Sequence, residues 1–239
     1  MDLTDHIGNI VASDYRTATV FKKYNIDFCC GGGKTIEAAC QSKGINKNQL
    51  LQDLLEIEKG SNPQQDQFNN WDLNRLVNYI EDKHHTYVRT TIVTLSQYLN
   101  KVAKVHGAHN PELKEILALF NTVADELEQH MQKEEMTLFA YIKEMANSEA
   151  LGTDLAKPHF GTIKNPIKMM EVEHDMVGNN MSEISRLSSG YTPPEYACNT
   201  YMVSYKLLEE FENDLHQHIH LENNILFPRA IELETQLLK

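Results

Sequence analysis

Residues 208–225 read Leu-Glu-Glu-Phe-Glu-Asn-Asp-Leu-His-Gln-His-Ile-His-Leu-Glu-Asn-Asn-Ile, and this stretch decides the fold. Residues spaced three or four apart in this stretch form one stripe along a helix, and they are Leu208, Phe211, Leu215, His218, Glu222 and Ile225. The stripe extends back through Ser204 and Tyr201 to Ala197. This spacing predicts an amphipathic helix that packs its stripe into a core. His218 and Glu222 would then lie inside the protein, among apolar side chains.

Three earlier segments carry stripes of the same kind. Their polar members are His85 in the first segment, His130 and Glu134 in the second, and His174 in the third. On the second segment, the stripe continues past Glu134 through Thr137 to Tyr141. Each segment therefore interrupts an apolar helix face with histidine or glutamate at a core position.

Capping residues and prolines mark where these helices begin and end. They predict helices over residues 72–102, 110–146 and 165–190, and a fourth from Thr192 onward that Pro228 ends or kinks. No segment alternates apolar and polar residues as a strand does. Four long helices with short connections favour an antiparallel four-helix bundle over residues 71–239.

The first 58 residues form a separate, smaller module in this interpretation. Short helices are expected over residues 14–24, 35–42 and 46–58. Between the first two lies Asp-Phe-Cys-Cys-Gly-Gly-Gly, residues 27–33, which we expect to be a loop because glycine disfavours helix. Residues 59–70 are polar and aperiodic, as in a linker. The fold class predicted is all-α, with a small N-terminal helical domain before the bundle.

Composition narrows the class of protein. The chain has 239 residues and a formal net charge of -12, so nucleic acid is not an expected partner. Its four cysteines are too few for a disulfide framework and indicate reduced thiols. Neither a secretory signal nor a membrane-spanning apolar stretch is visible, so we expect a cytoplasmic protein with no membrane partner.

The buried acids and histidines require a compensating positive charge. Burying an unpaired carboxylate costs several kcal/mol, and the four stripes contain no Lys or Arg. A single histidine on such a stripe is usually a hydrogen-bonded core residue, but two His-x-x-x-Glu pairs and two further histidines in phase indicate a metal. The predicted ligands are His85, His130, Glu134, His174, His218 and Glu222.

Six ligands exceed one tetrahedral zinc site and are too rich in nitrogen for calcium or magnesium. Two metals that share the two carboxylates fit the set, which favours two non-haem iron ions with an oxo or hydroxo bridge, and manganese as the main competitor. The hairpin spacing supports two matched halves, because His85 and His130 are 45 residues apart and His174 and His218 are 44. Periodicity alone leaves His84 and His85 both open, and this spacing favours His85.

The full pattern resembles the repair-of-iron-centres (RIC) family. The resemblance rests on His85-x44-His130-x3-Glu134, on Glu173-His174-Asp175, on the run from His218 to Ala230, and on Asp-Phe-Cys-Cys-Gly-Gly from residue 27. It implies an ScdA-type N-terminal domain, a hemerythrin-like bundle and a di-iron centre that helps to restore damaged iron–sulfur clusters. It also implies that Glu126 and Glu173 line a path for iron or orient the ligands, although either could be an ordinary solvated carboxylate.

Cys29 and Cys30 form the second candidate site. They precede a helix expected to start near Thr35, and Lys34 is close, so we predict a lowered thiol pKa and a role in relaying iron or capturing nitric oxide. Cys40 and Cys198 are interpreted as packing residues. His216 and His220, which flank the stripe, are expected to be solvated or to support the metal ligands.

Three functions are compatible with these features. The leading hypothesis is iron donation to iron–sulfur proteins damaged by nitric oxide or peroxide. The alternatives are reduction of nitric oxide to nitrous oxide at the di-iron centre, and hemerythrin-like binding of oxygen or nitric oxide. The oligomeric state stays open between a monomer and a homodimer.

Overall fold

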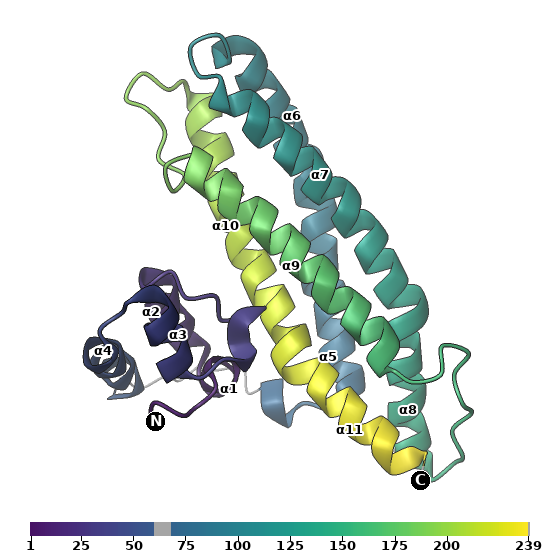
Figure 1. Cartoon of the computed structure of the whole chain (residues 1–239). Helices are drawn as coiled ribbons and strands as arrows, with labels where there is room; N and C mark the ends of the chain where they lie inside the picture. Colours follow the sequence, from purple (N-terminus) through teal and green to yellow (C-terminus); the bar gives the residue numbers. More distant parts are fainter. Residues whose placement is uncertain (60–67, 239) are drawn as a thin grey trace.

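The computed structural model describes residues 1–59 and 68–238. Within these ranges the chain is helical, with one isolated β-bridge between His6 and Thr35 and no strand. The prediction of an all-α protein is therefore confirmed. Figure 1 shows a long bundle with a smaller group of helices beside it. In the same ranges, no helix is long and apolar enough to cross a membrane.

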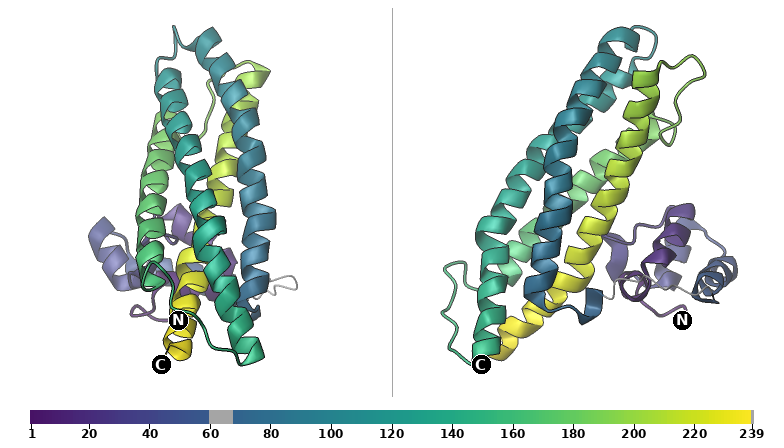
Figure 2. Two further views of the ribbon diagram at one scale, coloured as in Figure 1. Left: turned by 90° about the vertical axis from the view of Figure 1, so that its right-hand side faces the viewer. Right: turned by 180° about the vertical axis from the view of Figure 1, so that it is seen from behind.

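Four antiparallel helical runs form the bundle, as Figures 1 and 2 show from three sides. The first run is α5 (Leu73–Tyr79), a π-helical segment (Ile80–His85) and α6 (Thr86–His106). The second is α7 (Glu112–Lys133), a π-helical segment (Glu134–Leu138) and α8 (Phe139–Leu151). The third is α9 (Lys164–Leu187). The fourth is α10 (Asn199–Leu221), a π-helical segment (Glu222–Leu226) and α11 (Phe227–Leu237).

The start of the first run follows the sequence signal, whereas the start of the fourth does not. The Asp72 side chain accepts a hydrogen bond from the Arg75 backbone N–H at 2.8 Å, so it caps α5 as expected. The fourth helix begins at Asn199 instead of near Thr192. Two successive prolines follow Thr192, and a proline keeps the residue before it out of the helical conformation. Ala197 consequently lies outside the helix.

The three π-helical segments were not foreseen. A π turn accommodates one extra residue within a helix, so the buried positions after it move by one. On the second run the core residue is Leu138 at 1% exposure, whereas Thr137, which the stripe had placed there, is only half-buried. On the fourth run the helix continues past Pro228 to Leu237 instead of ending there. Pro228 is tolerated because it lies in the first turn of α11, after the π-helical segment.

The bundle core consists of two apolar clusters. The upper cluster includes Val88, Leu95, Phe120, Leu208 and Phe211. The lower cluster includes Ile80, Phe139, Met170, Leu226 and Phe227. All six predicted metal ligands lie between these clusters along their helices, so a polar layer interrupts an otherwise apolar core.

The N-terminal module contains one more helix than the sequence indicated. Its helices are α1 (Ile7–Ser13), α2 (Ala18–Lys23), α3 (Ile36–Lys43) and α4 (Lys47–Lys59). The three glycines at residues 31–33 form a short 3₁₀ turn instead of an open loop. Of the expected linker, Lys59 ends α4, residues 60–67 lie outside the described residues, and Phe68–Asn70 form a 3₁₀ turn.

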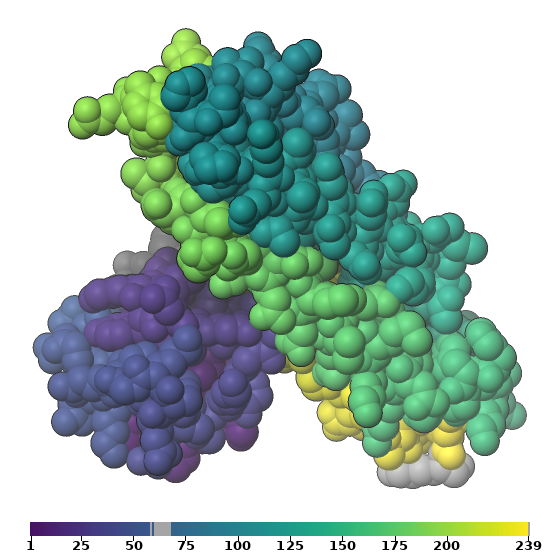
Figure 3. All heavy atoms as spheres, turned by 45° about the horizontal axis from the view of Figure 1, so that its top comes forward, coloured from purple at the N-terminus to yellow at the C-terminus, as the bar shows by residue number. Residues whose placement is uncertain are grey.

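The module packs against the fourth run close to Glu222. Asn224, inside the last π-helical segment, donates its amide to the backbone oxygen of Cys29 at 3.1 Å. Gly8 and Gly32 lie so close to the Asn224 side chain that a Cβ on either would collide with it. Figure 3 shows the module as a distinct lobe against the bundle. The small domain is thus seated directly on the helix that carries two of the candidate ligands.

Candidate metal centre

The six predicted ligands come together in the middle of the bundle. His85 ends the first π-helical segment, while Glu134 and Glu222 each begin one. The remaining three project from the regular helices α7, α9 and α10, and they are His130, His174 and His218. None of the six side chains is more than 2% exposed. π-helical turns occur often at functional sites, and three of the four runs place one at this layer.

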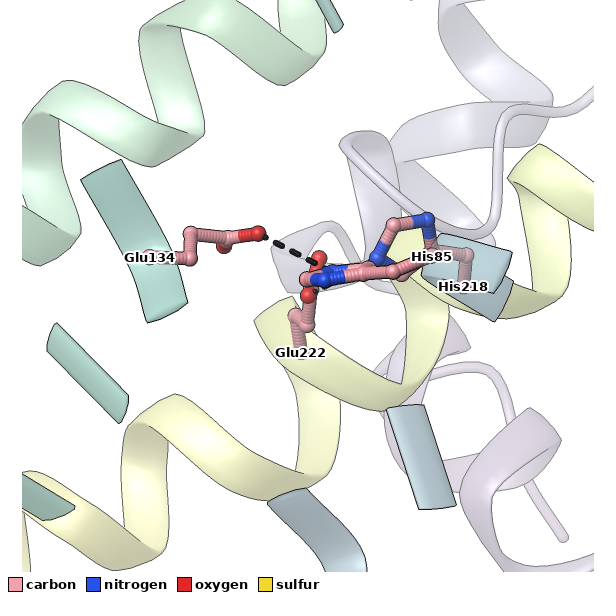
Figure 4. A group of neighbouring side chains, drawn as sticks. All are labelled: His85, Glu134, His218 and Glu222. Carbon is pink, nitrogen blue, oxygen red and sulfur yellow. Dashed lines mark hydrogen bonds and ion pairs between the residues drawn. The ribbon is translucent and has the colours of Figure 1, made fainter. Parts of the chain in front are cut away.

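The donor atoms form two overlapping groups. One contains His85, Glu134, His218 and Glu222, and the other contains His130, Glu134, His174 and Glu222. Figure 4 shows the side chains of the first group pointing toward one another. Within each group the ligand atoms lie within 4.8 Å of one another. Glu134 and Glu222 belong to both groups, so each could supply a ligand atom to either of two metal positions.

The spacing of the donor atoms is compatible with metal coordination. Nε2 of His85 and of His130 lie 3.4 and 3.3 Å from Glu134 Oε2, and His218 Nε2 lies 3.0 Å from Glu222 Oε1. Two donors bound to one metal at about 2.1 Å and at right angles are about 3 Å apart. Both oxygens of Glu134 and one of Glu222 are buried without a hydrogen-bond partner. Such orphaned acceptors are costly unless a cation binds them, so the residues fit a pair of metal ions.

The charges of the metal-free cluster depend on one another. Burial alone would lower the pKa of His130, but Glu134, Glu173 and Glu222 raise it to about 10. Burial alone would raise the pKa of Glu222, but His218 and His174 hold it well below the ordinary value. The buried carboxylates therefore stay ionised, as metal ligands must.

Three of the four histidines donate a hydrogen bond from Nδ1–H to an oxygen of a neighbouring side chain. His85 Nδ1 lies 2.7 Å from Glu135 Oε1, and His130 Nδ1 lies 2.9 Å from Glu173 Oε2. His174 Nδ1 lies 2.9 Å from Asn223 Oδ1. Such partners orient the ring and leave Nε2 free for a metal. Glu173 was singled out from the sequence, whereas Glu135 and Asn223 were missed, although each directly follows one of the two glutamates that the donor groups share.

The two neighbouring histidines of the first run have different surroundings. His85 faces Glu134, while His84 donates its Nδ1–H to Asp214 Oδ1 at 3.0 Å. The ring of His84 stacks on that of His218, with centroids 5.4 Å apart and an interplanar angle of 8°. His84 belongs to neither donor group. The geometry thus agrees with the choice of His85 as the ligand.

Glu126, His216 and His220, which the sequence also offered as candidates, lie outside the two donor groups. Among the described residues, no hydrogen bond or ion pair joins Glu126 to the cluster, although it lies one turn before His130. Of the two alternatives expected for His216 and His220, solvation is wrong for His220, which is 1% exposed, whereas His216 is half-buried. Both contact the ring of Phe28, and burial lowers the pKa of each to about 4. They form part of the surface on which the N-terminal module sits.

The cysteine pair also differs from its prediction. Cys29 is buried, and the neighbouring Cys30 thiol, burial and the Asp27 carboxylate all raise its pKa well above the ordinary value. Asp27 is held there because it accepts the backbone N–H groups of Cys29, Cys30 and Gly31. The prediction of a lowered thiol pKa is therefore wrong for Cys29. Cys30 is partly exposed, and donor atoms of Asp27, Cys29 and Cys30 lie within 4.8 Å of one another.

The pair opens onto a cavity of about 740 Å³ between the module and the bundle. Its walls include Lys22 and Asp27 from the module and Met181, Glu212 and His216 from α9 and α10. Of the remaining cysteines, Cys40 is buried as expected. Cys198 is exposed instead of packed, and its Sγ lies 3.2 Å from His106 Nε2.

Comparison with known proteins identifies the family to which the chain belongs. Residues 3–58 match the ScdA_N domain, described as a domain of unknown function, and residues 76–230 match the hemerythrin HHE cation binding domain. Proteins of Yersinia pestis (strain Pestoides F) and Yersinia pseudotuberculosis (serotype O:1b, strain IP 31758), both named iron–sulfur cluster repair protein YtfE, are 33% identical over 95% of this chain and 97% of their own length. The chain accordingly belongs to the repair-of-iron-centres family, in which an ScdA-type domain precedes a hemerythrin-like bundle.

Proposed function

We propose that this protein holds two iron ions in its bundle and donates iron to rebuild iron–sulfur clusters damaged by nitric oxide or peroxide. The observation that carries the proposal is the pair of buried donor groups that share Glu134 and Glu222. The names of the Yersinia relatives support the same role. Cluster repair would take place in the cytoplasm, where the cysteines of such clients stay reduced.

The chemistry of the donors suits a protein that must release its metal. Each group offers two imidazole nitrogens and two carboxylates, whereas iron–sulfur clusters are held by thiolates. Ferrous iron is among the more weakly bound first-row divalent metals at such sites. Histidine and glutamate can therefore hold it without trapping it, and a cysteine-rich client can compete for it.

We assign Cys29 and Cys30, with Asp27, to the next binding position along the way out of the bundle. The support is their place beside the π-helical segment that begins with Glu222, because Asn224 of that segment donates its amide to the backbone oxygen of Cys29. Cys30 is the accessible member of the pair, at the wall of the interdomain cavity. In this proposal Glu173 orients His130, and Glu126 offers a carboxylate on α7 one turn before His130.

The test is a repair assay under anaerobic conditions. An iron–sulfur enzyme whose cluster has been damaged by nitric oxide is mixed with the iron-loaded protein, and the visible absorption and activity of the client are followed. We expect both to recover, and the Glu134→Ala variant, which removes a shared ligand, to lose the effect. The Glu128→Gln variant, exposed on the same helix, is the matched control and should behave as the parent protein does.

Two further measurements define the limits of the proposal. Mixing the diferrous protein with nitric oxide should give stoichiometric nitrosylation with iron release, whereas catalytic formation of nitrous oxide would favour a reductase.

The double variant Cys29→Ser/Cys30→Ser should lose repair at unchanged iron content. If repair stays intact, the cysteine pair has no part in the transfer.

A further inference from the structure

The two helical hairpins of the bundle repeat one donor pattern at a shift of 88 or 89 residues. The shift relates His85 to His174, His130 to His218, and Glu134 to Glu222. It also relates the two donor groups to each other, because each takes one histidine from each hairpin. Residues that flank the donors can therefore be compared in pairs.

The residues that follow the two glutamates behave alike. Glu135 accepts a hydrogen bond from His85 Nδ1 at 2.7 Å, and Asn223 accepts one from His174 Nδ1 at 2.9 Å. In each hairpin, therefore, the residue after the shared carboxylate orients the first histidine. This pair follows the repeat.

The residues that precede the first histidine of each hairpin do not behave alike. Glu173 accepts a hydrogen bond from His130 Nδ1 at 2.9 Å. The repeat relates Glu173 to residue 84, which should then serve His218. That residue is a histidine, which stacks on the His218 ring and directs its Nδ1 to Asp214. Nδ1 of His218 is buried with no hydrogen-bond partner among the described residues.

Resting on the iron-donor function above, we propose that the two metal positions are unequal and that iron held by His85 and His218 leaves first. A histidine that binds metal through Nε2 carries its proton on Nδ1, and the partner of that proton is typically worth ten- to a hundredfold in metal affinity. At the position of His130 and His174, both histidines have an Nδ1 partner. At the position of His85 and His218, only His85 has one. Glu134 and Glu222 belong to both donor groups, so the number of carboxylates does not distinguish the two positions.

Unequal binding suits a donor. The metal that remains at His130 and His174 keeps a positive charge between Glu134 and Glu222, which are both fully buried. Loss of both ions at once would leave the two carboxylates with only neighbouring histidines as compensating groups. With one labile and one retained ion, the bundle can deliver iron while a metal cation still lies between the carboxylates.

The test measures release without any client. Protein loaded anaerobically with two ferrous ions is mixed with an excess of ferrozine, and the absorbance of the ferrous complex is followed. We expect two phases of equal amplitude with rates about ten- to a hundredfold apart. His218→Ala should remove the fast phase and His174→Ala the slow one, with circular dichroism to verify that each loaded variant is folded.

A second pair of variants exchanges the partners and leaves all six ligands in place. In His84→Gln, the amide oxygen can accept from His218 Nδ1 and the amide NH₂ can donate to Asp214, so the fast phase should slow about tenfold. In Glu173→His, His130 loses its acceptor, so the slow phase should become faster. Glu128→Gln is again the control.

The outcomes separate this inference from the proposed function. A single release phase, a fast phase that survives in His218→Ala, or unchanged rates in His84→Gln would overturn the inequality even if clients are repaired. Two phases that respond as expected establish the inequality, even if no client regains its cluster. In that case only the donor function fails.

Discussion

His84 and His85 are adjacent, and both are fully buried, yet only His85 faces the shared carboxylates. The sequence could not separate them by periodicity because the helix changes phase where they lie. Ile80–His85 is a π-helical segment, so His84 is in phase with the residues before it and His85 with those after it. Only the match between the hairpin spacings favoured His85.

The raised pKa of His130 leads to a prediction about metal loading. Burial lowers this pKa, but Glu134, Glu173 and Glu222 raise it to about 10. In the metal-free protein at pH 7, the His130 ring is therefore protonated on both nitrogens and positively charged. A metal binds only the neutral ring. We therefore expect ferrous iron or manganese binding at pH 7 to release protons and the affinity to increase as the pH rises toward 10. Calorimetry in two buffers of different ionisation enthalpy measures the number of protons released.

His130→Ala is the control for that measurement and should release fewer protons. Equal heats in both buffers would contradict the prediction. The same shift affects stability in the metal-free protein. A raised pKa stabilises the fold fully below the ordinary value of 6.5, and this contribution is lost as the pH rises through about 10.

At the scale of the elements, the π-helical segments explain how the helices combine two requirements. The upper and lower clusters need an apolar face, and the layer between them needs several polar side chains close together. One extra residue in a π turn adds room for donors without rotating the rest of the helix. Glu134–Leu138 and Glu222–Leu226 each begin with a candidate ligand.

Removal of Met136 tests this explanation. Met136 is 71% exposed within the segment Glu134–Leu138, so its deletion takes nothing from the core. We expect the remaining residues to form a regular helix, the lower core to keep its register, and the protein to unfold at nearly the parental temperature. Metal affinity should fall, because Glu135, the partner of His85, lies in the segment. Thermal unfolding and metal titration measure the two effects.

Deletion of Thr122 is the matched control. This residue is also exposed, but it lies in the regular helix α7, where no extra residue is available to absorb the change. The deletion rotates the rest of the run relative to the core, and we expect a cooperative fold to be lost. Equal destabilisation by the two deletions would contradict our account of the π-helical segments.

At the scale of the whole molecule, the N-terminal module is held to the bundle beside the candidate centre. Phe28 packs against His216 and His220, Asn224 donates to the Cys29 carbonyl, and Lys22 donates to Asn213. Ile219 of α10 belongs to the apolar cluster of the module. The cysteine pair is therefore positioned by contacts with the same helix that supplies His218 and Glu222.

Gly32→Ala tests the close approach on which this docking depends. The new Cβ would collide with the Asn224 side chain, so the module must shift or Asn224 must rotate away. We expect a loss of about 1–3 kcal/mol of unfolding free energy and a larger radius of gyration by small-angle scattering. Gly33→Ala is the matched control, because a Cβ there meets no atom within 4 Å. If both variants behave as the parent does, the two domains do not dock as described.

The sequence by itself determined the fold class, the order of the two modules, and the six residues that meet at the centre. These depend on periodicity and capping, which are properties of single helices. His218 and Glu222 could be recognised as inward-facing because their neighbours on the stripe are apolar. The domain boundaries and the roles of the ligands stay predictions.

Only the tertiary structure decided what surrounds those residues. The Nδ1 partners Glu135, Glu173 and Asn223 are 43 to 50 residues away from their histidines, beyond the reach of any local pattern. Burial of Cys29 and His220 likewise depends on which surface the small module covers. Periodicity shows which side of a helix faces inward, whereas the contacts there depend on how separate helices pack together.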